Sequence, residues 1–123
     1  AGTIVVLPRA TCGLQETARI ARYLSRESAG QCGPCVFGLR ALADAAVALA
    51  GGRHAIEALR DMRDLPGEIE GRGACAHPDG AARLARSAID AFPREVQLHL
   101  QGRCSAPHGA PVVRVPASTG EWR

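Results

Sequence analysis

Apolar side chains recur at helical spacing along most of the chain. Leu14, Ala18, Ala21 and Leu24 follow one another at intervals of three or four residues, which places them on one face of a helix. Three later stretches repeat this pattern. The predicted helices cover residues 13–28, 34–50, 54–70 and 78–100. Four helices joined by short connections predict an all-α fold, a small four-helix bundle.

Glycine and proline mark the limits of these helices. Gly30 and Gly51 each follow a predicted helix and interrupt its apolar pattern. Pro66 falls inside the third helix, which we expect to kink or split there, because proline cannot donate the backbone hydrogen bond that an inner turn needs. Gly71 is expected to close that helix in a left-handed conformation. Pro93 is expected to kink the fourth helix.

Both ends of the chain depart from the helical pattern. Residues 3–7 form an apolar run that Pro8 stops, and they predict one short buried strand left over from a preceding domain. An unpaired strand edge seeks a partner, so pairing with a second copy in a homodimer stays open. The chain therefore divides into a strand and linker at 1–11, a helical bundle at 12–103 and an irregular tail at 104–123.

The composition limits the fold and the classes of partner that we expect for this chain. Alanine dominates the apolar residues and aromatic residues make up only 3% of the chain, which fits closely packed helices better than a sheet. The net charge of +3 comes with no basic stripe and no stacking aromatics, so nucleic acid is not an expected partner. No apolar run is long enough to enter a membrane directly. Five unevenly spaced cysteines without a signal-peptide pattern predict a reducing, cytoplasmic location.

Three of the cysteines have a spacing that suits a metal centre. Cys32 and Cys35 form a C-x-x-C pair, in which both thiols can bind one metal centre from a single turn of backbone. Pro34 suits the first position of a helix, so Cys35 would lie in the first turn, where backbone N–H groups and the helix dipole favour a thiolate. Cys75 comes forty residues later, just before the fourth helix. The starts of the second and fourth helices are therefore predicted to face one centre.

Two short motifs around these cysteines carry a family resemblance. The run S-x-G-Q-C-x-P-C at 28–35 and the run I-E-G-R-x-x-C at 69–75 resemble the C-terminal iron–sulfur domain of the NADH-oxidising flavoprotein subunit of respiratory complex I. The similarity covers roughly residues 1–103. In that family four cysteines hold a [4Fe–4S] cluster that takes electrons from flavin. Cys32, Cys35 and Cys75 match three of them, and Ala29 stands where the first family cysteine belongs.

The resemblance implies an electron-transfer module. With three thiolates, the bound centre would be a [3Fe–4S] cluster, or a [4Fe–4S] cluster with a histidine or an exogenous fourth ligand. The family's FMN and NAD sites lie in an N-terminal domain, so this chain is not expected to be a catalytically complete enzyme by itself. Other subunits of an NADH dehydrogenase-like complex are the implied partners.

Two alternatives stay open at this point. Cys32, Cys35 and Cys75 together with His77 would make a structural zinc site of the Cys₃His type. His77 would equally serve as a plain helix-capping residue. The other alternative is a metal-free bundle that only docks partner subunits.

The remaining cysteines and histidines are predicted to lie outside this site. Cys12 precedes the first helix and Cys104 follows the fourth. About sixteen helical residues at 1.5 Å each separate Cys12 from the Cys32 region, a distance of about 25 Å. We therefore expect Cys12 and Cys104 to be free thiols at the far end of the bundle, close to one another. Surface positions are expected for His54, His99 and His108.

Overall fold

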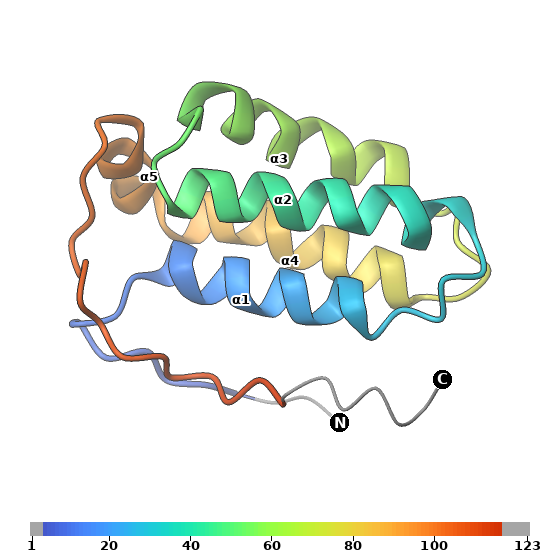
Figure 1. Ribbon diagram of the computed structural model, residues 1–123, viewed down its shortest axis with the longest axis horizontal. Helices are drawn as coiled ribbons and strands as arrows, with labels where there is room; N and C mark the ends of the chain where they lie inside the picture. Colours follow the sequence, from blue (N-terminus) through green and yellow to red (C-terminus); the bar gives the residue numbers. More distant parts are fainter. Residues whose placement is uncertain (1–3, 117–123) are drawn as a thin grey trace.

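Four long helices run antiparallel to one another in the computed structural model, which describes residues 4–116 (Figure 1). They are α1 (Gly13–Arg26), α2 (Leu39–Ala50), α3 (Ala55–Ile69) and α4 (His77–Ala91). A short π-helical segment, η1 (Pro34–Gly38), leads into α2, and α5 (Pro93–Leu100) lies across one end of the bundle. Each long helix packs against its neighbours in the ring α1, α2, α3, α4. The predicted all-α bundle is confirmed.

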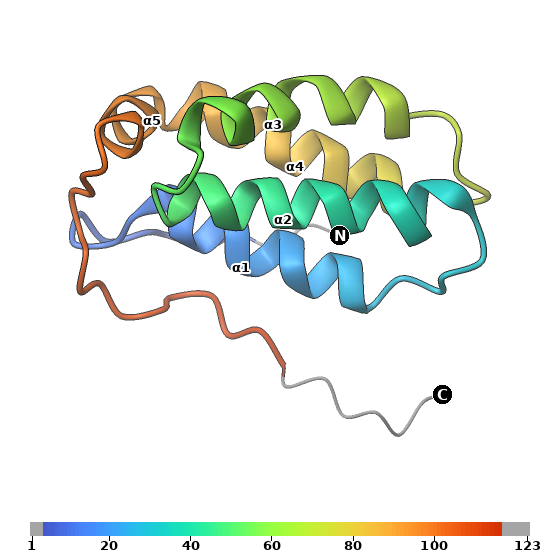
Figure 2. The same ribbon diagram turned by 45° about the horizontal axis from the view of Figure 1, so that its top comes forward.

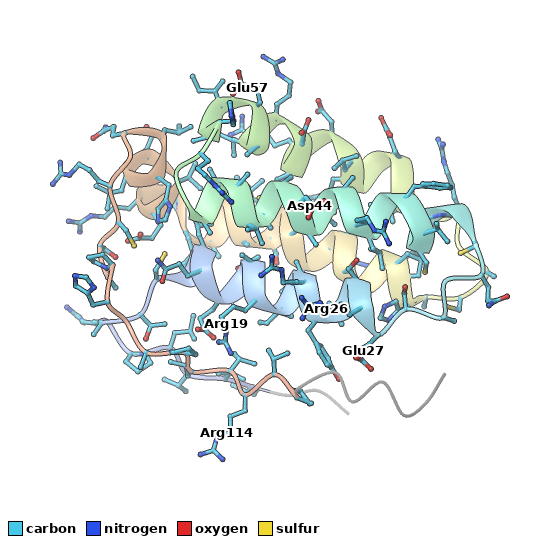
Figure 3. All side chains as sticks on the ribbon, viewed as in Figure 1. Arg19, Arg26, Glu27, Asp44, Glu57 and Arg114 are labelled. Atoms are coloured by element: carbon cyan, nitrogen blue, oxygen red, sulfur yellow. The ribbon has the colours of Figure 1, made fainter. Side chains whose placement is uncertain are left out.

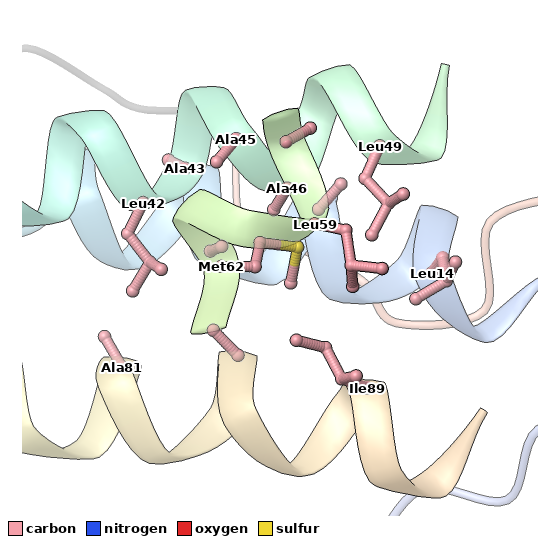
Figure 4. Packing of buried hydrophobic residues seen from close by; sticks show 14 of the residues in the cluster. Leu14, Leu42, Ala43, Ala45, Ala46, Leu49, Leu59, Met62, Ala81 and Ile89 are labelled. Carbon is pink, nitrogen blue, oxygen red and sulfur yellow. The ribbon is translucent and has the colours of Figure 1, made fainter. Parts of the chain in front are cut away.

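Small side chains fill much of the core. Leu14, Leu42, Leu49, Met62 and Ile89 are among its larger apolar side chains, and Met62 lies near the middle of the cluster (Figure 4). Buried alanines on every long helix surround them. Side chains this small let helix axes approach closely, toward the short end of the usual range of about 8–10 Å. The predicted alanine-rich packing of helices is therefore how this core is built.

Two prolines behave differently from each other. Pro66 stays inside α3, which continues without a break to Ile69. Its ring is buried in the core, which offsets part of the cost of the one helical hydrogen bond that a proline cannot donate. At Pro93 the chain does more than kink, because Phe92 leaves the helical conformation with φ −120° and ψ 49°. The predicted fourth helix is therefore two helices, α4 and α5.

The predicted N-terminal strand is not found in the part of the chain that the structure describes. Residues 4–7 have no regular secondary structure, and Ile4 is 93% exposed. A strand needs a hydrogen-bonding partner, and residues 4–116 contain no strand that would supply one. The prediction of a buried strand is wrong for these residues, and Thr3 lies outside the described range. No described helix is both long enough and apolar enough to cross a membrane.

Candidate metal centre

Two loops meet at the end of the bundle where α1 and α3 finish. The connection from α1 to η1 and the connection from α3 to α4 both lie at this end, on the right of Figures 1 and 2. The first connection contains Ala29 and Cys32, and the second contains Cys75. Cys35 lies in the first turn of the helical segment that follows the first connection. The start of α1 and the whole of α5 lie at the opposite end.

Cys32 and Cys35 lie on one tight turn. The backbone N–H groups of Cys35 and Val36 donate to the Cys32 carbonyl at 3.1 and 3.0 Å. Pro34 occupies the first helical position, as predicted. The turn that follows is π-helical, because the Leu39 N–H donates to the Pro34 carbonyl. Such wide turns are rare and often mark functional sites.

Hydrogen bonds, burial and neighbouring thiols change the pKa values of Cys32 and Cys35. Backbone hydrogen bonds from Ala74 and from Cys35 lower the pKa of Cys32, because they stabilise its thiolate. Burial raises the pKa of Cys35, and the neighbouring Cys32 and Cys75 thiols raise it further. Ala74 and Cys75 both belong to the second loop. Cys32, Cys35 and Cys75, here called the cysteine triad, therefore face one region.

The E-G-R segment is tied to α4 through its glutamate and its glycine. The Gly71 N–H donates to Asp79 Oδ1 at 3.0 Å, and Glu70 forms an ion pair of 2.9 Å with Arg86. Gly71 has φ +73°, the left-handed conformation predicted for it, and Gly30 in the other loop has φ +64°. Side chains other than glycine rarely adopt this region. Both loops of the site therefore turn at a glycine.

His77 joins the start of α4 to the end of α1. Its Nε2 donates to the Leu24 carbonyl at 2.8 Å, and a carbonyl oxygen can only accept. The lone pair of the ring is then on Nδ1. Ligands around one zinc ion lie about 3.8 Å apart when both are thiolates, from Zn–S bonds of about 2.3 Å. In residues 4–116, one group of three or more Cys, His, Asp or Glu side chains has all of its ligand atoms within 4.8 Å of one another. That group lies at the opposite end of the bundle and does not include His77.

A wide hollow opens beside Ala29. It measures about 770 Å³ and is lined by Ala29, Cys35 and three arginines, Arg22, Arg26 and Arg40. Arg26 and Glu27 mark the end of α1, next to this hollow, and Asp44 of α2 lies on its wall (Figure 3). Several basic side chains therefore line the hollow beside Ala29.

The opposite end of the bundle holds the other two cysteines. Cys12 Sγ lies 3.5 Å from Glu95 Oε2 and 3.4 Å from His99 Nε2. Burial raises the pKa of Cys12 to about 12, and the adjacent Cys104 raises it too. The prediction that Cys12 and Cys104 lie close together, away from Cys75, is confirmed.

His99 is the histidine that sequence reasoning misplaced. It was expected on the surface, but its side chain is 2% exposed, whereas His54 and His108 are exposed as predicted. The break before Pro93 lays α5 across the bundle and turns this face inward. A signal was present in the sequence, because His99 lies three residues after the apolar Val96 and hence on the same helix face.

Two comparisons with known proteins found relatives of this chain. The family described as the NADH-ubiquinone oxidoreductase-F iron-sulfur binding region matches residues 10–99. The F subunit of the NADH-quinone oxidoreductase of Streptomyces coelicolor is 30% identical over 93 residues, which are 76% of this chain and 21% of that protein. The F subunit of the Rickettsia felis enzyme is 30% identical over 105 residues, 85% of this chain and 25% of that protein.

The corresponding protein of Mycobacterium tuberculosis shows the same relation. It is 31% identical over 97 residues, 79% of this chain and 22% of that protein. The chain thus spans about a quarter or less of the length of these relatives. The family match covers both cysteine-bearing loops and all of the long helices. This chain belongs to the NADH-ubiquinone oxidoreductase-F iron-sulfur binding region family.

Proposed function

We propose that this chain holds an iron–sulfur cluster on Cys32, Cys35 and Cys75 and relays single electrons within an NADH dehydrogenase-like complex. The family to which it belongs supports the type of centre. The observation that carries the choice of residues is the convergence of three thiols from two loops at one end of the bundle, one of them with a lowered pKa. When bound, the cluster supplies one-electron transfer.

The residues present fit three corners of such a cluster. Thiolates are the usual ligands of iron–sulfur clusters, and the backbone hydrogen bonds to Cys32 already favour its thiolate form. Cys35 lies at the core end of the turn and is 6% exposed, so the protein shields that side from water. Cys75 lies two residues before the start of α4, where the positive end of the helix dipole favours a negative centre.

The fourth corner lacks a cysteine. We propose that Ala29 takes the place of the family's first cysteine, since it keeps the S-x-G-x-C spacing with Ser28, Gly30 and Cys32. The centre would then be [3Fe–4S], or [4Fe–4S] with His77 Nδ1 or an exogenous group as its fourth ligand. Nδ1 is the nitrogen that the hydrogen bond to Leu24 leaves with its lone pair.

The remaining parts of the electron path are proposed to lie outside this chain. The curated relatives are four to five times longer than the region matched here. A flavin in a separate domain or subunit would deliver electrons to the cluster, and a further subunit would accept them. The chain contributes the position, the shielding and the hydrogen bonds of the cluster.

Anaerobic purification with iron, sulfide and zinc measured per chain tests the proposal. We expect about three or four iron atoms with matching sulfide, and an electron paramagnetic resonance signal of an iron–sulfur cluster. Cys75→Ser should lose most of this iron, whereas the matched substitution Cys104→Ser at the opposite end should keep it. A folded wild-type chain without iron after anaerobic reconstitution, or with zinc that Cys75→Ser removes, would overturn the proposal.

A further inference from the structure

Four side chains with metal-binding groups gather at the end of the bundle opposite to the cysteine triad. Cys12 precedes α1, Glu95 and His99 belong to α5, and Cys104 follows α5. Their ligand atoms all lie within 4.8 Å of one another. Cys12 is separated from the other three by more than eighty residues of sequence, so tertiary packing brings the set together.

The distances match a tetrahedral zinc site. Bonds of about 2.3 Å to sulfur and about 2.0–2.2 Å to nitrogen or oxygen place neighbouring ligand atoms about 3.3–3.8 Å apart. The Cys12 sulfur lies 3.4 Å from His99 Nε2 and 3.5 Å from Glu95 Oε2. His99 Nε2 and Glu95 Oε2 are 3.5 Å apart. Three of the distances between ligand atoms are therefore already close to those around a bound zinc ion.

The ring of His99 is held as a metal ligand usually is. Its Nδ1 donates to the Leu49 carbonyl at 3.0 Å, which leaves the Nε2 lone pair facing Cys12 and Glu95. Histidines that bind metal commonly donate their other N–H to a backbone carbonyl or a carboxylate, and this fixes both tautomer and orientation. The ring is almost fully buried, so it cannot turn out to water without opening the core.

Neighbouring groups also orient the other members. Glu95 and His99 are four residues apart on α5 and so share a helix face. The Ser105 N–H donates to Glu95 Oε2 at 3.4 Å, and Gln15 Nε2 donates to the Cys104 sulfur at 3.7 Å. The Glu95 side chain is 12% exposed. The set is therefore preorganised and nearly closed to solvent.

We propose that Cys12, Glu95, His99 and Cys104 bind one zinc ion, which fastens the start of α1 to α5 and to the beginning of the tail. Two thiolates and an imidazole in a tetrahedral arrangement favour zinc over magnesium or calcium, which prefer oxygen ligands. Four protein ligands leave no open position, so the ion is structural. This site goes beyond the cluster proposed above and shares no residue with it.

The test separates this site from the cysteine triad. A chain with Cys32, Cys35 and Cys75 all replaced by serine has no triad thiols, so zinc or cobalt bound to it reports on the second site. We expect one zinc per chain, a visible absorption band of thiolate-bound tetrahedral cobalt, and a higher Tm with the metal than without it.

Single substitutions in the same background identify the ligands. Cys12→Ser and His99→Gln should each weaken zinc binding by more than 100-fold, and Gln15→Ala, which removes the donor to Cys104, by about 10–100-fold. His108→Ala changes an exposed histidine of the tail and serves as the matched control, with zinc binding unchanged. Circular dichroism of each variant checks that the bundle is folded.

Two results would overturn the proposal. One is a folded triple-serine chain that binds neither zinc nor cobalt more tightly than its His99→Gln derivative. The other is a Cys12–Cys104 disulfide, found by mass spectrometry in protein prepared with reductant. The wild-type chain gives a second measurement, because Cys104→Ser should lose zinc and keep iron. Iron and sulfide are counted separately from zinc, so failure of one site is distinguishable from failure of the other.

Discussion

At the scale of single residues, two thiols three positions apart have opposite properties. Cys32 lies half-buried in the loop, where backbone hydrogen bonds from Ala74 and Cys35 lower its pKa. Cys35 faces the core, where burial raises the pKa of its thiol. Hydrogen bonds to a thiolate stabilise the charged form, whereas an apolar surrounding penalises it. The C-x-x-C pair therefore combines one reactive thiol with one shielded thiol.

We expect Cys32 to be alkylated before Cys35 and Cys12 in the metal-free protein. A lower pKa gives more thiolate at neutral pH, and this gain outweighs the modest loss of intrinsic nucleophilicity. Iodoacetamide labelling followed by peptide mass spectrometry across a pH series measures the rates. The order should be Cys32 before Cys35, with Cys12 last because burial raises its pKa to about 12. Equal rates in the folded protein would contradict this, and the urea-unfolded chain, where all should react alike, is the control.

Ala29→Cys should strengthen the proposed cluster. In the cluster proposed above, the added thiol would supply the missing fourth ligand, beside the hollow that Ala29 and Cys35 share. A cluster iron without a protein thiolate is the one most readily lost, so we expect more iron per chain and slower bleaching of the visible absorption in air. Ala29→Ser, which adds a hydroxyl of similar size, is the control. Identical iron content and oxygen sensitivity in all three proteins would show that another group already fills the corner.

At the scale of elements, the loop ends decide how the site is presented. α3 ends at Ile69, Glu70 is extended with φ −60° and ψ 135°, and Gly71 turns the chain with φ +73°. The Gly71 N–H then bonds to Asp79 in the first turn of α4. This combination of a left-handed glycine and a side-chain acceptor carries the loop directly into the segment with Cys75.

Gly71→Ala should lower the free energy of unfolding by about 1–2 kcal/mol. No atom lies within 4 Å of the position of an added Cβ, so the cost comes from the left-handed backbone alone. Urea denaturation followed by circular dichroism measures it. Gly67→Ala is the matched control, because Gly67 lies inside α3 with equally open space and alanine there should stabilise by about 0.5–1 kcal/mol. A destabilisation of the same size in both variants would contradict this explanation.

At the scale of the whole molecule, one buried carboxylate docks the tail on the bundle. Glu16 of α1 is 4% exposed and accepts backbone hydrogen bonds from Val112 at 3.2 Å and Val113 at 2.9 Å. Arg19 completes the arrangement by bonding to both Glu16 and the Val113 carbonyl, and it lies between α1 and the tail in Figure 3. The described part of the tail is irregular, as predicted, but it is fastened along α1.

Glu16→Gln should release this part of the tail while the helices stay folded. An amide nitrogen cannot accept from a backbone N–H, so one of the two contacts is lost, and hydrogen bonds to charged groups are worth about 1.5–3 kcal/mol. Hydrogen exchange at Val112 and Val113 should therefore speed up by about 10–100-fold. Glu57→Gln, which changes an exposed acid on α3 (Figure 3), should leave exchange unchanged. Equal protection of the tail in both variants would refute the docking role of Glu16.

Much of this architecture follows from local sequence. The apolar spacing predicts the four long helices, because burying one face of a helix requires an apolar residue every three or four positions. Gly71 predicts the turn that ends α3, since it supplies a left-handed backbone directly after the C-cap residue Glu70, whereas α1 ends at Arg26, before Gly30. Helix lengths then place Cys12 far from Cys75, because 1.5 Å per residue is fixed by backbone geometry. Spacing and motif also predict the grouping of Cys32 with Cys35 and Cys75.

Only the tertiary structure decided the remainder. The π turn after Pro34, the burial of His99 and the contacts of Cys12 with Glu95 depend on how segments distant in sequence pack together. Local pattern shows that Pro93 interrupts a helix, but the direction in which the chain continues is set by the surface that α5 can bury against. The apolar run that includes residues 4–7 shows the same limit, because its local pattern predicts a strand but does not show whether a pairing segment is present. Sheet hydrogen bonds require a second segment, which residues 4–116 do not offer.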